Sequence, residues 1–296
     1  MAFGLTWALA AILGCGSAAP KANELDPGNV AKCTKDAAVQ SQYERSCLLG
    51  MLDQYLAGLS QGDATDLPVA TGLRSTENGV ATALDAGLWK TQVSLGTFRQ
   101  DFADSQTGQV GTLVVIQSDA APALLALRLK VTEGRIAESE IIVTRSGQAA
   151  FFAPQNLTMA EPVFDELLPA DQKLSREKLV AVVDGYFDGI VRNDATGIEF
   201  DPMCHRVENG VETAKSPNIG AQFPIFSYIK RIDRRILVVD EERGLVWGVF
   251  VFQVPGESIY APRTTFVSEL FKVTGGAFLT IHAFLLNTPY GTPTGW

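Results

Sequence analysis

The chain of 296 residues is 46% hydrophobic and 19% charged, which is enough apolar material for one large domain or two ordinary ones. Its net charge of -9 and its pI near 4.8 argue against a nucleic-acid partner, which would require a basic surface. The sequence has no apolar stretch long enough to span a membrane outside its extreme N-terminus.

Residues 1–15 have the pattern of an export leader, because a short apolar run, Phe3 to Gly14, precedes small residues and a polar segment. Ile12-Leu13-Gly14-Cys15 resembles a bacterial lipobox, in which Cys15 would carry a lipid, although no Lys or Arg precedes the run and Leu13 is bulkier than usual. We expect an exported protein, periplasmic or anchored to the outer membrane through that lipid alone. The alternatives are a cytoplasmic protein with a buried N-terminal segment, or a misassigned start codon.

The remaining cysteines are Cys33, Cys47 and Cys204. Cys33 and Cys47 flank the start of the first expected helix and could pair in an oxidising compartment, but the sequence leaves that pairing open. Cys204 would then be a lone thiol. Because none of them has the spacing of a metal site, we expect neither a metal nor another cofactor.

The strongest pattern is an internal repeat. Glu77-Asn78-Gly79-Val80 returns as Glu208-Asn209-Gly210-Val211, an offset of 131 (208 − 77). Asp63-Ala64-Thr65 returns at the same offset. An apolar helical face returns with them, as Leu48, Met51, Leu52, Tyr55, Leu56, Leu59 and then Leu179, Val182, Val183, Tyr186, Phe187, Ile190. The repeat predicts two copies of one structural unit.

Each copy is expected to be a long amphipathic helix followed by an antiparallel meander. The helices are predicted over about Ala37 to Ser60 and from the N-cap Ser175 to about Arg192. The expected strands are Gly96–Ala103, Gln109–Gln117, Ala123–Val131 and Arg135–Thr144 in the first copy, and Arg231–Asp240, Leu245–Val254, Thr264–Val273 and Ala277–Leu286 in the second. A helix on a strongly curved sheet gives an α+β cone with an apolar interior.

This order of helix, Asp-Ala-Thr turn, Glu-Asn-Gly turn and meander resembles the nuclear-transport-factor-2-like superfamily, also called SnoaL-like or cystatin-like cones. The doubled form is similar to an uncharacterised tandem family of bacteria and fungi. Members of that family end in Pro-Tyr-Gly-x-Pro-x-Gly-Trp, which is here Pro289-Tyr290-Gly291-Thr292-Pro293-Thr294-Gly295-Trp296. Because sheets of such proteins commonly pair face to face, the resemblance implies an intramolecular pseudo-dimer, present as a monomer or as a homodimer.

We therefore expect five segments: a leader at 1–15, a tether at 16–35, a first cone domain at 36–144, a packed linker at 145–174 and a second cone domain at 175–296. The linker is expected to lie between the cones because Phe151, Phe152, Phe164 and Leu167 are too apolar for a free tether.

The only two histidines, His205 and His282, fall in the second copy, where the first copy has Arg74 (205 − 131) and a position near Glu140. This difference indicates that the copies diverged in role, and histidine is suited to proton transfer near neutral pH. We predict His282 or His205 as the base, with Glu208, Arg206 and Tyr186 in supporting catalytic roles. The alternatives are a hydrogen-bonded strand residue for His282, a surface loop residue for His205 and core packing for Tyr186.

The Glu-Asn-Gly elements have a structural interpretation that we favour, because Asn-Gly is the strongest short signal for a type I′ turn. We nevertheless expect Asn209, Tyr228, Trp247 and Tyr260 to bind ligand, the aromatic ones as a lining for a flat molecule. Plain core packing is the alternative for such aromatic residues, except for Tyr260 in the inserted loop from Pro255 to Pro262.

The sequence has no Gly-x-Ser-x-Gly elbow, P-loop, Gly-x-Gly-x-x-Gly after a strand or His-Glu-x-x-His. Superfamily enzymes perform acid–base chemistry in a dry pocket, as lyases, dehydratases, isomerases or cyclases. We therefore expect a cofactor-independent enzyme that acts on a small apolar or aromatic molecule in the second cone. The alternative is a non-catalytic exported lipoprotein that binds a ligand or a protein.

Overall fold

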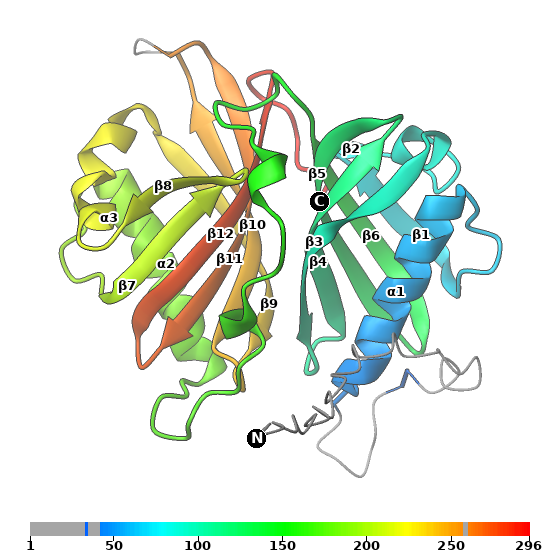
Figure 1. The fold of residues 1–296 in the computed structure, drawn as a ribbon, viewed down its shortest axis with the longest axis horizontal. Helices are drawn as coiled ribbons and strands as arrows, with labels where there is room; N and C mark the ends of the chain where they lie inside the picture. The colour runs from blue at the N-terminus through cyan, green and yellow to red at the C-terminus, as the bar shows by residue number, and fades with distance from the viewer. Residues whose placement is uncertain (1–32, 35–41, 257–259) are drawn as a thin grey trace, which may run out of the picture.

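The computed structural model describes residues 33–34, 42–256 and 260–296 (Figure 1). It is an α+β protein of two tandem domains, each with a six-stranded sheet. The expected leader, with Cys15, and most of the expected tether lie outside the described residues. Among the helices of the described ranges, none is long and apolar enough to cross a membrane.

The first domain contains α1 (Arg45–Gln61), β1 (Val69–Glu77), β2 (Val80–Ala81), η2 (Gly87–Lys90), β3 (Val93–Asp104), β4 (Gln109–Ser118), β5 (Ala121–Thr132) and β6 (Arg135–Thr144). Its strand order is β2-β1-β6-β5-β4-β3. The β1–β6 pair is parallel and the others are antiparallel.

The second domain repeats this plan with α2 (Arg176–Arg192), β7 (Phe200–Glu208), β8 (Val211–Lys215), α3 (Asn218–Ala221), η5 (Phe223–Tyr228), β9 (Arg231–Asp240), β10 (Leu245–Val254), β11 (Arg263–Thr274) and β12 (Ala277–Thr288). The strand order is β8-β7-β12-β11-β10-β9, and only the β7–β12 pair is parallel. Matching strands therefore occupy matching places in the two sheets.

The four predicted meander strands of each copy are present, but two details of the prediction were wrong. Helix α1 begins at Arg45, because residues 42–44 are not helical and the Tyr43 amide donates instead to the Ser105 carbonyl, at 2.8 Å. The strands that flank the Glu-Asn-Gly turns, β1, β2, β7 and β8, were also missed. They carry much of the chemistry described below.

Each sheet has a helix side and an interface side, because side chains alternate along a strand. The apolar faces of α1 and α2 are buried against the helix sides of their own sheets. The interface sides meet in a third core, in which Phe102 of β3 stacks on Trp247 of β10 with ring centroids 4.9 Å apart. This arrangement leaves two separate domain interiors and one apolar interface.

The linker runs along the junction of the two sheets (Figure 1) and contains η3 (Pro154–Asn156) and η4 (Pro162–Phe164). Phe164 is fully buried in the interface core and Phe152 packs against that core, whereas Phe151 and Leu167 are exposed. The linker thus packs between the domains, although only part of its apolar surface is covered.

Both Glu-Asn-Gly elements form the expected turn with positive φ, at 51° and 81° for Asn78 and Gly79 and at 49° and 85° for Asn209 and Gly210. Cys33 and Cys47 form a disulfide bond beside the first core. Cys204 is free and buried in the second core, where burial raises its pKa to about 12. A thiol with so high a pKa is unreactive.

Candidate active site in the second domain

The residues predicted to form one site lie on two faces of the second sheet. Arg206 and Glu208 of β7 point to the helix side, where Arg206 reaches Tyr186 of α2. His205 and His282 point to the interface side and meet at Glu161 of the linker. Both histidines and Glu208 therefore do not converge in one cavity, because neighbouring residues of a strand face opposite ways.

Arg206 is the centre of the cluster on the helix side and is only 2% exposed. Its Nη1 donates to the Tyr186 hydroxyl at 3.1 Å, and its Nη2 donates to Gln222 Oε1 at 2.5 Å. Its Nε donates to the Thr213 hydroxyl at 3.2 Å and lies 3.6 Å from Glu208 Oε2. A buried guanidinium held by this many partners is a fixed positive charge inside the domain.

Glu269 of β11 is the functional residue that the sequence analysis missed. It is 3% exposed, and the residues opposite it on the neighbouring strands are the small Gly248 and Ala283. Burial raises the pKa of Glu269 to about 8. The charge of Glu208 adds to this shift, and the charge of Arg206 opposes it without cancelling it. Glu269 is therefore a largely neutral carboxylic acid near pH 7. A lone acidic residue within the apolar strand Thr264–Val273 was the available signal.

The cluster is enclosed by aromatic rings. Tyr186 makes ring contacts of 5.2–6.5 Å between centroids with five phenylalanines, namely Phe187, Phe200, Phe223, Phe271 and Phe278. Burial raises the pKa of the Tyr186 hydroxyl above its ordinary value, against the opposing effect of Arg206. The Tyr186 hydroxyl is therefore a neutral group that accepts a hydrogen bond from Arg206 and retains its own proton.

A cavity of about 110 Å³ lies between the linker, η5, the end of β10, the start of β11 and the end of β12, and Glu208 is the member of the cluster that lines it. Glu208, Phe226 and Tyr228 line it together with Arg263. The Arg263 guanidinium lies over the rings of Tyr228 and Tyr260 at 5.5 and 5.3 Å, and those rings are 4.2 Å apart. Tyr228 and Tyr260 thus form an aromatic pair at a pocket that Glu208 reaches.

Two of the residues predicted to bind ligand have other roles. Asn209 is 1% exposed: its amide nitrogen donates to the carbonyls of Phe151 and Leu285, and its side-chain oxygen accepts from the Leu285 amide. It therefore fixes the turn and the linker, although it borders the pocket. Trp247 lies on the interface side and not in the interior of the second domain, because its position on β10 points toward Phe102.

The first domain has different residues at the matching positions. Arg206 corresponds to Ser75 (206 − 131), and Glu269 corresponds to Leu127 (269 − 142). Tyr55 matches Tyr186 (186 − 131), but its hydroxyl pairs with Ser139 at 2.6 Å. The charged interior cluster is thus a feature that only the second of the two copies carries.

The second cluster, on the interface side, joins both histidines to one carboxylate. Glu161 Oε1 lies 2.7 Å from His282 Nε2 and 2.9 Å from His205 Nε2. Burial would raise the pKa of Glu161, but its hydrogen bonds to the two histidines outweigh burial and lower that pKa. The hydrogen bond to Glu161 also raises the pKa of His205. Glu161 could not be found from sequence, since it lies in the linker, far along the chain from both histidines.

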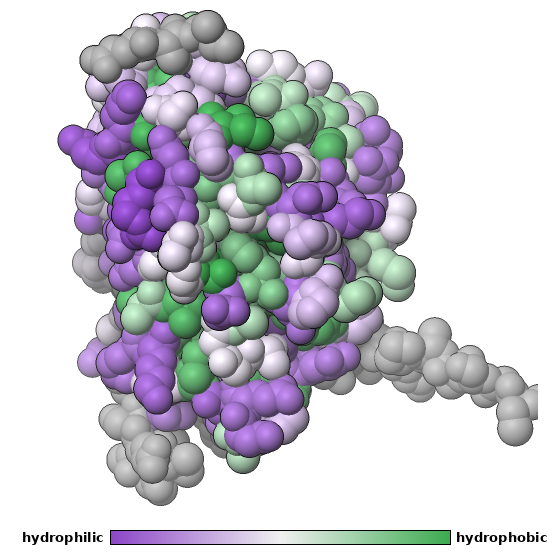
Figure 2. All heavy atoms as spheres, turned by 90° about the vertical axis from the view of Figure 1, so that its left-hand side faces the viewer, coloured by the Kyte–Doolittle hydropathy of each residue, from purple (hydrophilic) through white to green (hydrophobic). Residues whose placement is uncertain are grey.

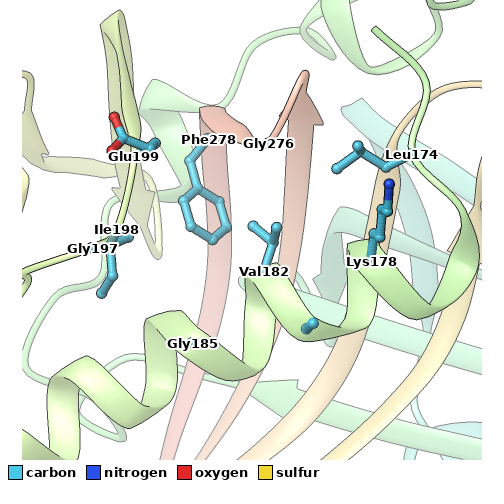
Figure 3. A pocket seen from close by; sticks show the side chains of 10 residues that line it. Leu174, Lys178, Val182, Gly185, Gly197, Ile198, Glu199, Gly276 and Phe278 are labelled. Carbon is cyan, nitrogen blue, oxygen red and sulfur yellow. The ribbon is translucent and has the colours of Figure 1, made fainter.

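The outer face of the second domain has a further pocket of about 430 Å³ between α2, residues 197–199 and the start of β12. Figure 3 shows Phe278 between Ile198 and Val182, with Lys178 near Leu174 at the other end. Phe278 also contacts Tyr186, so it separates this pocket from the charged cluster. Apolar residues form a band between polar ones on this side of the molecule (Figure 2).

Residues 172–285, which span α2 and most of the second sheet, match a family described as "Domain of unknown function (DUF8021)". A comparison with curated proteins found no match. Similar solved structures include a de novo designed protein with a curved β-sheet, at 14% identity and a TM-score of 0.32, covering 38% of this chain and 88% of that one. Another is AusH from Aspergillus nidulans, at 13% identity and a TM-score of 0.32, covering 38% and 85%. These likenesses are weak, and the proposals below rest on the geometry of the chain itself.

Proposed function

We propose that the protein is a cofactor-independent acid–base enzyme whose active site is the interior of the second domain. The observation that carries this proposal is the buried carboxyl group of Glu269. Burial raises its pKa to about 8, although the charge of the buried Arg206 acts on it in the opposite direction. Two carboxyl groups in unlike environments, both under the influence of one fixed cation, can move protons at neutral pH.

Each residue has a role that follows from its surroundings. Glu269 is the general acid, because it is neutral and buried. Glu208 is the base, because it borders the pocket and forms an ion pair with Arg206. Arg206 and the Tyr186 hydroxyl stabilise negative charge that develops on a substrate oxygen. In this assignment the two histidines take no part in the proton transfers.

The substrate is a small, largely apolar or aromatic molecule with one polar group. The lining of the pocket supports this choice, since Phe226, Tyr228 and Phe252 contribute rings and Arg263 contributes a cation at the rim. The reaction type is that of a lyase, dehydratase, isomerase or cyclase, in which a proton is removed next to a group that holds the resulting charge.

The same proposal includes the fold family. We assign both domains to nuclear-transport-factor-2-like cones that form an intramolecular pseudo-dimer. In support, strand order and connectivity are the same in both sheets, and their interface sides share one core. Residue pairs related by the repeat offset also make reciprocal contacts across the interface, Arg176 with Asp104 and Arg45 with Asp240.

Export from the cytoplasm, with a lipid anchor on Cys15, is also part of the proposal. The disulfide between Cys33 and Cys47 supports it, because such bonds persist in oxidising compartments. The competing function is that of a non-catalytic binding protein. The Tyr228 and Tyr260 pair under Arg263 favours it, since aromatic rings at a pocket can hold a flat ligand without chemistry.

Hydrogen exchange at carbon tests the proposal without a known substrate. A panel of small apolar ketones, enones and lactones is incubated with the protein in heavy water, and deuterium incorporation next to the carbonyl is followed by NMR. We expect incorporation for at least one compound and its loss in Glu208→Gln and Glu269→Gln. Glu77→Gln is the matched control, because Glu77 is the repeat counterpart of Glu208 and accepts from the Leu88 amide at 2.7 Å. Binding of compounds without any exchange that depends on Glu208 or Glu269 favours the binding protein.

A further inference from the structure

Three segments that are distant in the sequence bring His205, His282 and Glu161 together on the interface side of the second sheet. His205 comes from β7, His282 from β12 and Glu161 from the linker just before η4. Their potential ligand atoms all lie within 4.8 Å of one another. Both histidines direct Nε2 at the same carboxylate oxygen.

We propose that Glu161, His205 and His282 form a binding site for a divalent transition-metal ion such as Zn²⁺. Two imidazole nitrogens and one carboxylate oxygen are a ligand set that first-row divalent ions take, with one or more coordination positions left for water or substrate. This proposal is independent of the acid–base site, and it departs from the expectation of a metal-free protein drawn from the cysteine spacing.

The distances fit a site that closes on an ion with little movement. Ligand atoms at about 2.1 Å from a tetrahedral metal ion are about 3.4 Å apart. The two histidine nitrogens lie 2.9 and 2.7 Å from Glu161 Oε1, so these contacts have to lengthen by about 0.5 and 0.7 Å to reach that spacing. Glu161 precedes a short 3₁₀ turn in the linker, and rotation of its side chain supplies that movement.

The surroundings already orient the proposed ligands. The His282 ring is 3% exposed and lies between Phe98, at 6.2 Å, and Phe164, at 5.2 Å. His205 has a hydrogen bond to the backbone of Met203, and Thr280 Oγ1 lies 3.3 Å from Glu161 Oε2. Partners of this kind fix the ring orientation of metal-binding histidines and hold the ligating carboxylate.

The site is open on one side. A pocket of about 270 Å³ adjoins it and is lined by Glu161 and His282 together with Met159, Val207 and Glu212. A small molecule or a water can therefore reach an ion held there. This access distinguishes the site from a closed structural site with four protein ligands.

The repeat provides an internal comparison. In the first sheet, Arg74 and Glu140 occupy the places of His205 and His282, since Thr76 pairs with Glu140 as Val207 pairs with His282. There Arg128 forms ion pairs with Glu140 and Glu138, at 3.0 and 2.7 Å. The first copy thus balances its charges with arginine, and in the second copy two histidines and one carboxylate converge instead.

The experiment is a Zn²⁺ titration of the full-length protein, stripped with chelator, by isothermal titration calorimetry at pH 7.5. We expect one high-affinity Zn²⁺ per chain. Glu161→Gln, His205→Gln and His282→Gln should each weaken binding at least tenfold. Glu212→Gln is the matched control, because Glu212 lines the same pocket and its charge acts on His205 without supplying a ligand, and this variant should weaken binding far less than the three ligand variants.

A second measurement identifies the ligands directly. Co²⁺ in place of Zn²⁺ should give a visible ligand-field absorption band, which disappears in His205→Gln even if His282→Gln fails to fold. Two results would overturn the proposal: the absence of any stoichiometric Zn²⁺ or Co²⁺ uptake, or uptake that the Glu161 and His205 variants leave unchanged.

Discussion

Arg176 Nη2 lies 2.6 Å from Asp104 Oδ1 and joins the first turn of α2 to the end of β3 in the other domain. The reciprocal contact exists as well, because Arg45 at the start of α1 lies 3.7 Å from Asp240 at the end of β9. The two arginines are 131 positions apart in the sequence (176 − 45) and the two aspartates are 136 positions apart (240 − 104), so each pair consists of equivalent residues of the two copies. Such an exchange of equivalent partners is what the proposed intramolecular pseudo-dimer requires.

The first prediction concerns this ion pair. The Asp104 side chain is fully buried. Besides the ion pair with Arg176, it accepts hydrogen bonds from the backbone amides of Gln106, Thr107 and Val239. Arg176→Ala should therefore lower the free energy of unfolding by about 1–3 kcal/mol, because it leaves a buried carboxylate with fewer partners. Chemical denaturation measures the loss. Arg45→Ala, whose contact is longer, is the matched control and should cost less.

A double-mutant cycle of Arg176→Ala with Asp104→Asn then separates the pair from its surroundings. A coupling energy above about 1 kcal/mol supports direct stabilisation across the interface. If the two losses simply add, the contact does not stabilise the docking of the domains.

The second prediction follows from the raised pKa of Glu269. In the unfolded chain this carboxyl ionises near its ordinary pKa of 4.5, whereas in the folded protein burial raises the pKa to about 8. The folded state therefore holds the proton more tightly, and its stability is full below pH 4.5 and falls as the pH rises to about 8. The fall should be on the order of a few kcal/mol. Glu269→Gln should remove it, as a comparison of denaturation midpoints from pH 5 to pH 8 would reveal.

A substitution of Glu208 tests the direction of the pKa shift of Glu269. The charge of Glu208 helps to raise the pKa of Glu269, so Glu208→Gln should lower that pKa, while Glu77→Gln in the first domain should leave it unchanged. Carbon NMR of labelled glutamate follows the titration. A Glu269 carboxyl that titrates near 4.5 in the folded protein would contradict both the environment described here and its role as an acid.

The repeat made much of the fold predictable from sequence. Meander strands in both copies followed from alternation and glycine turns, and the shared apolar stripe marked the buried helix faces. Strand β7 was missed because Asp201, Pro202, His205 and Arg206 break the apolar alternation that marks a strand. Without that strand, nothing in the sequence showed that His205 and Arg206 point to opposite faces.

The sites were harder to predict than the fold, for a physical reason. A strand pattern shows which residues share a face, but it does not show which distant segment covers that face. Glu161 lies in the linker and reaches His282 across 121 residues. Glu269 was visible as a charge in an apolar strand, but only its place in the sheet, opposite Gly248 and Ala283, explains why it is buried and why its pKa is raised.

The third prediction concerns Trp296, which lies over three arginines of both domains. Its ring centroid is 4.2 Å from Arg74, 4.7 Å from Arg128 and 5.3 Å from Arg235, and its indole nitrogen donates to the Thr76 hydroxyl at 3.0 Å. Trp296→Ala should destabilise the protein by about 2–4 kcal/mol, because it removes the stacking and leaves a gap. Trp296→Phe keeps a ring and should cost about 1 kcal/mol, the value of the lost hydrogen bond. Equal losses in both variants would mean that stacking on the arginines contributes little.

The last prediction concerns the disulfide between Cys33 and Cys47. The bond links residues 14 apart in sequence and ties the buried Cys33 to Cys47 in the first turn of α1, beside the first core. Restricting the unfolded chain by a loop of this size stabilises the folded state by about 2–3 kcal/mol. Replacing both cysteines by serine should lower the urea midpoint accordingly, and reductant should shift the midpoint of the unchanged protein but not that of the double variant. If reductant shifts both proteins equally, its effect lies elsewhere. If it shifts neither, the disulfide does not stabilise the first domain.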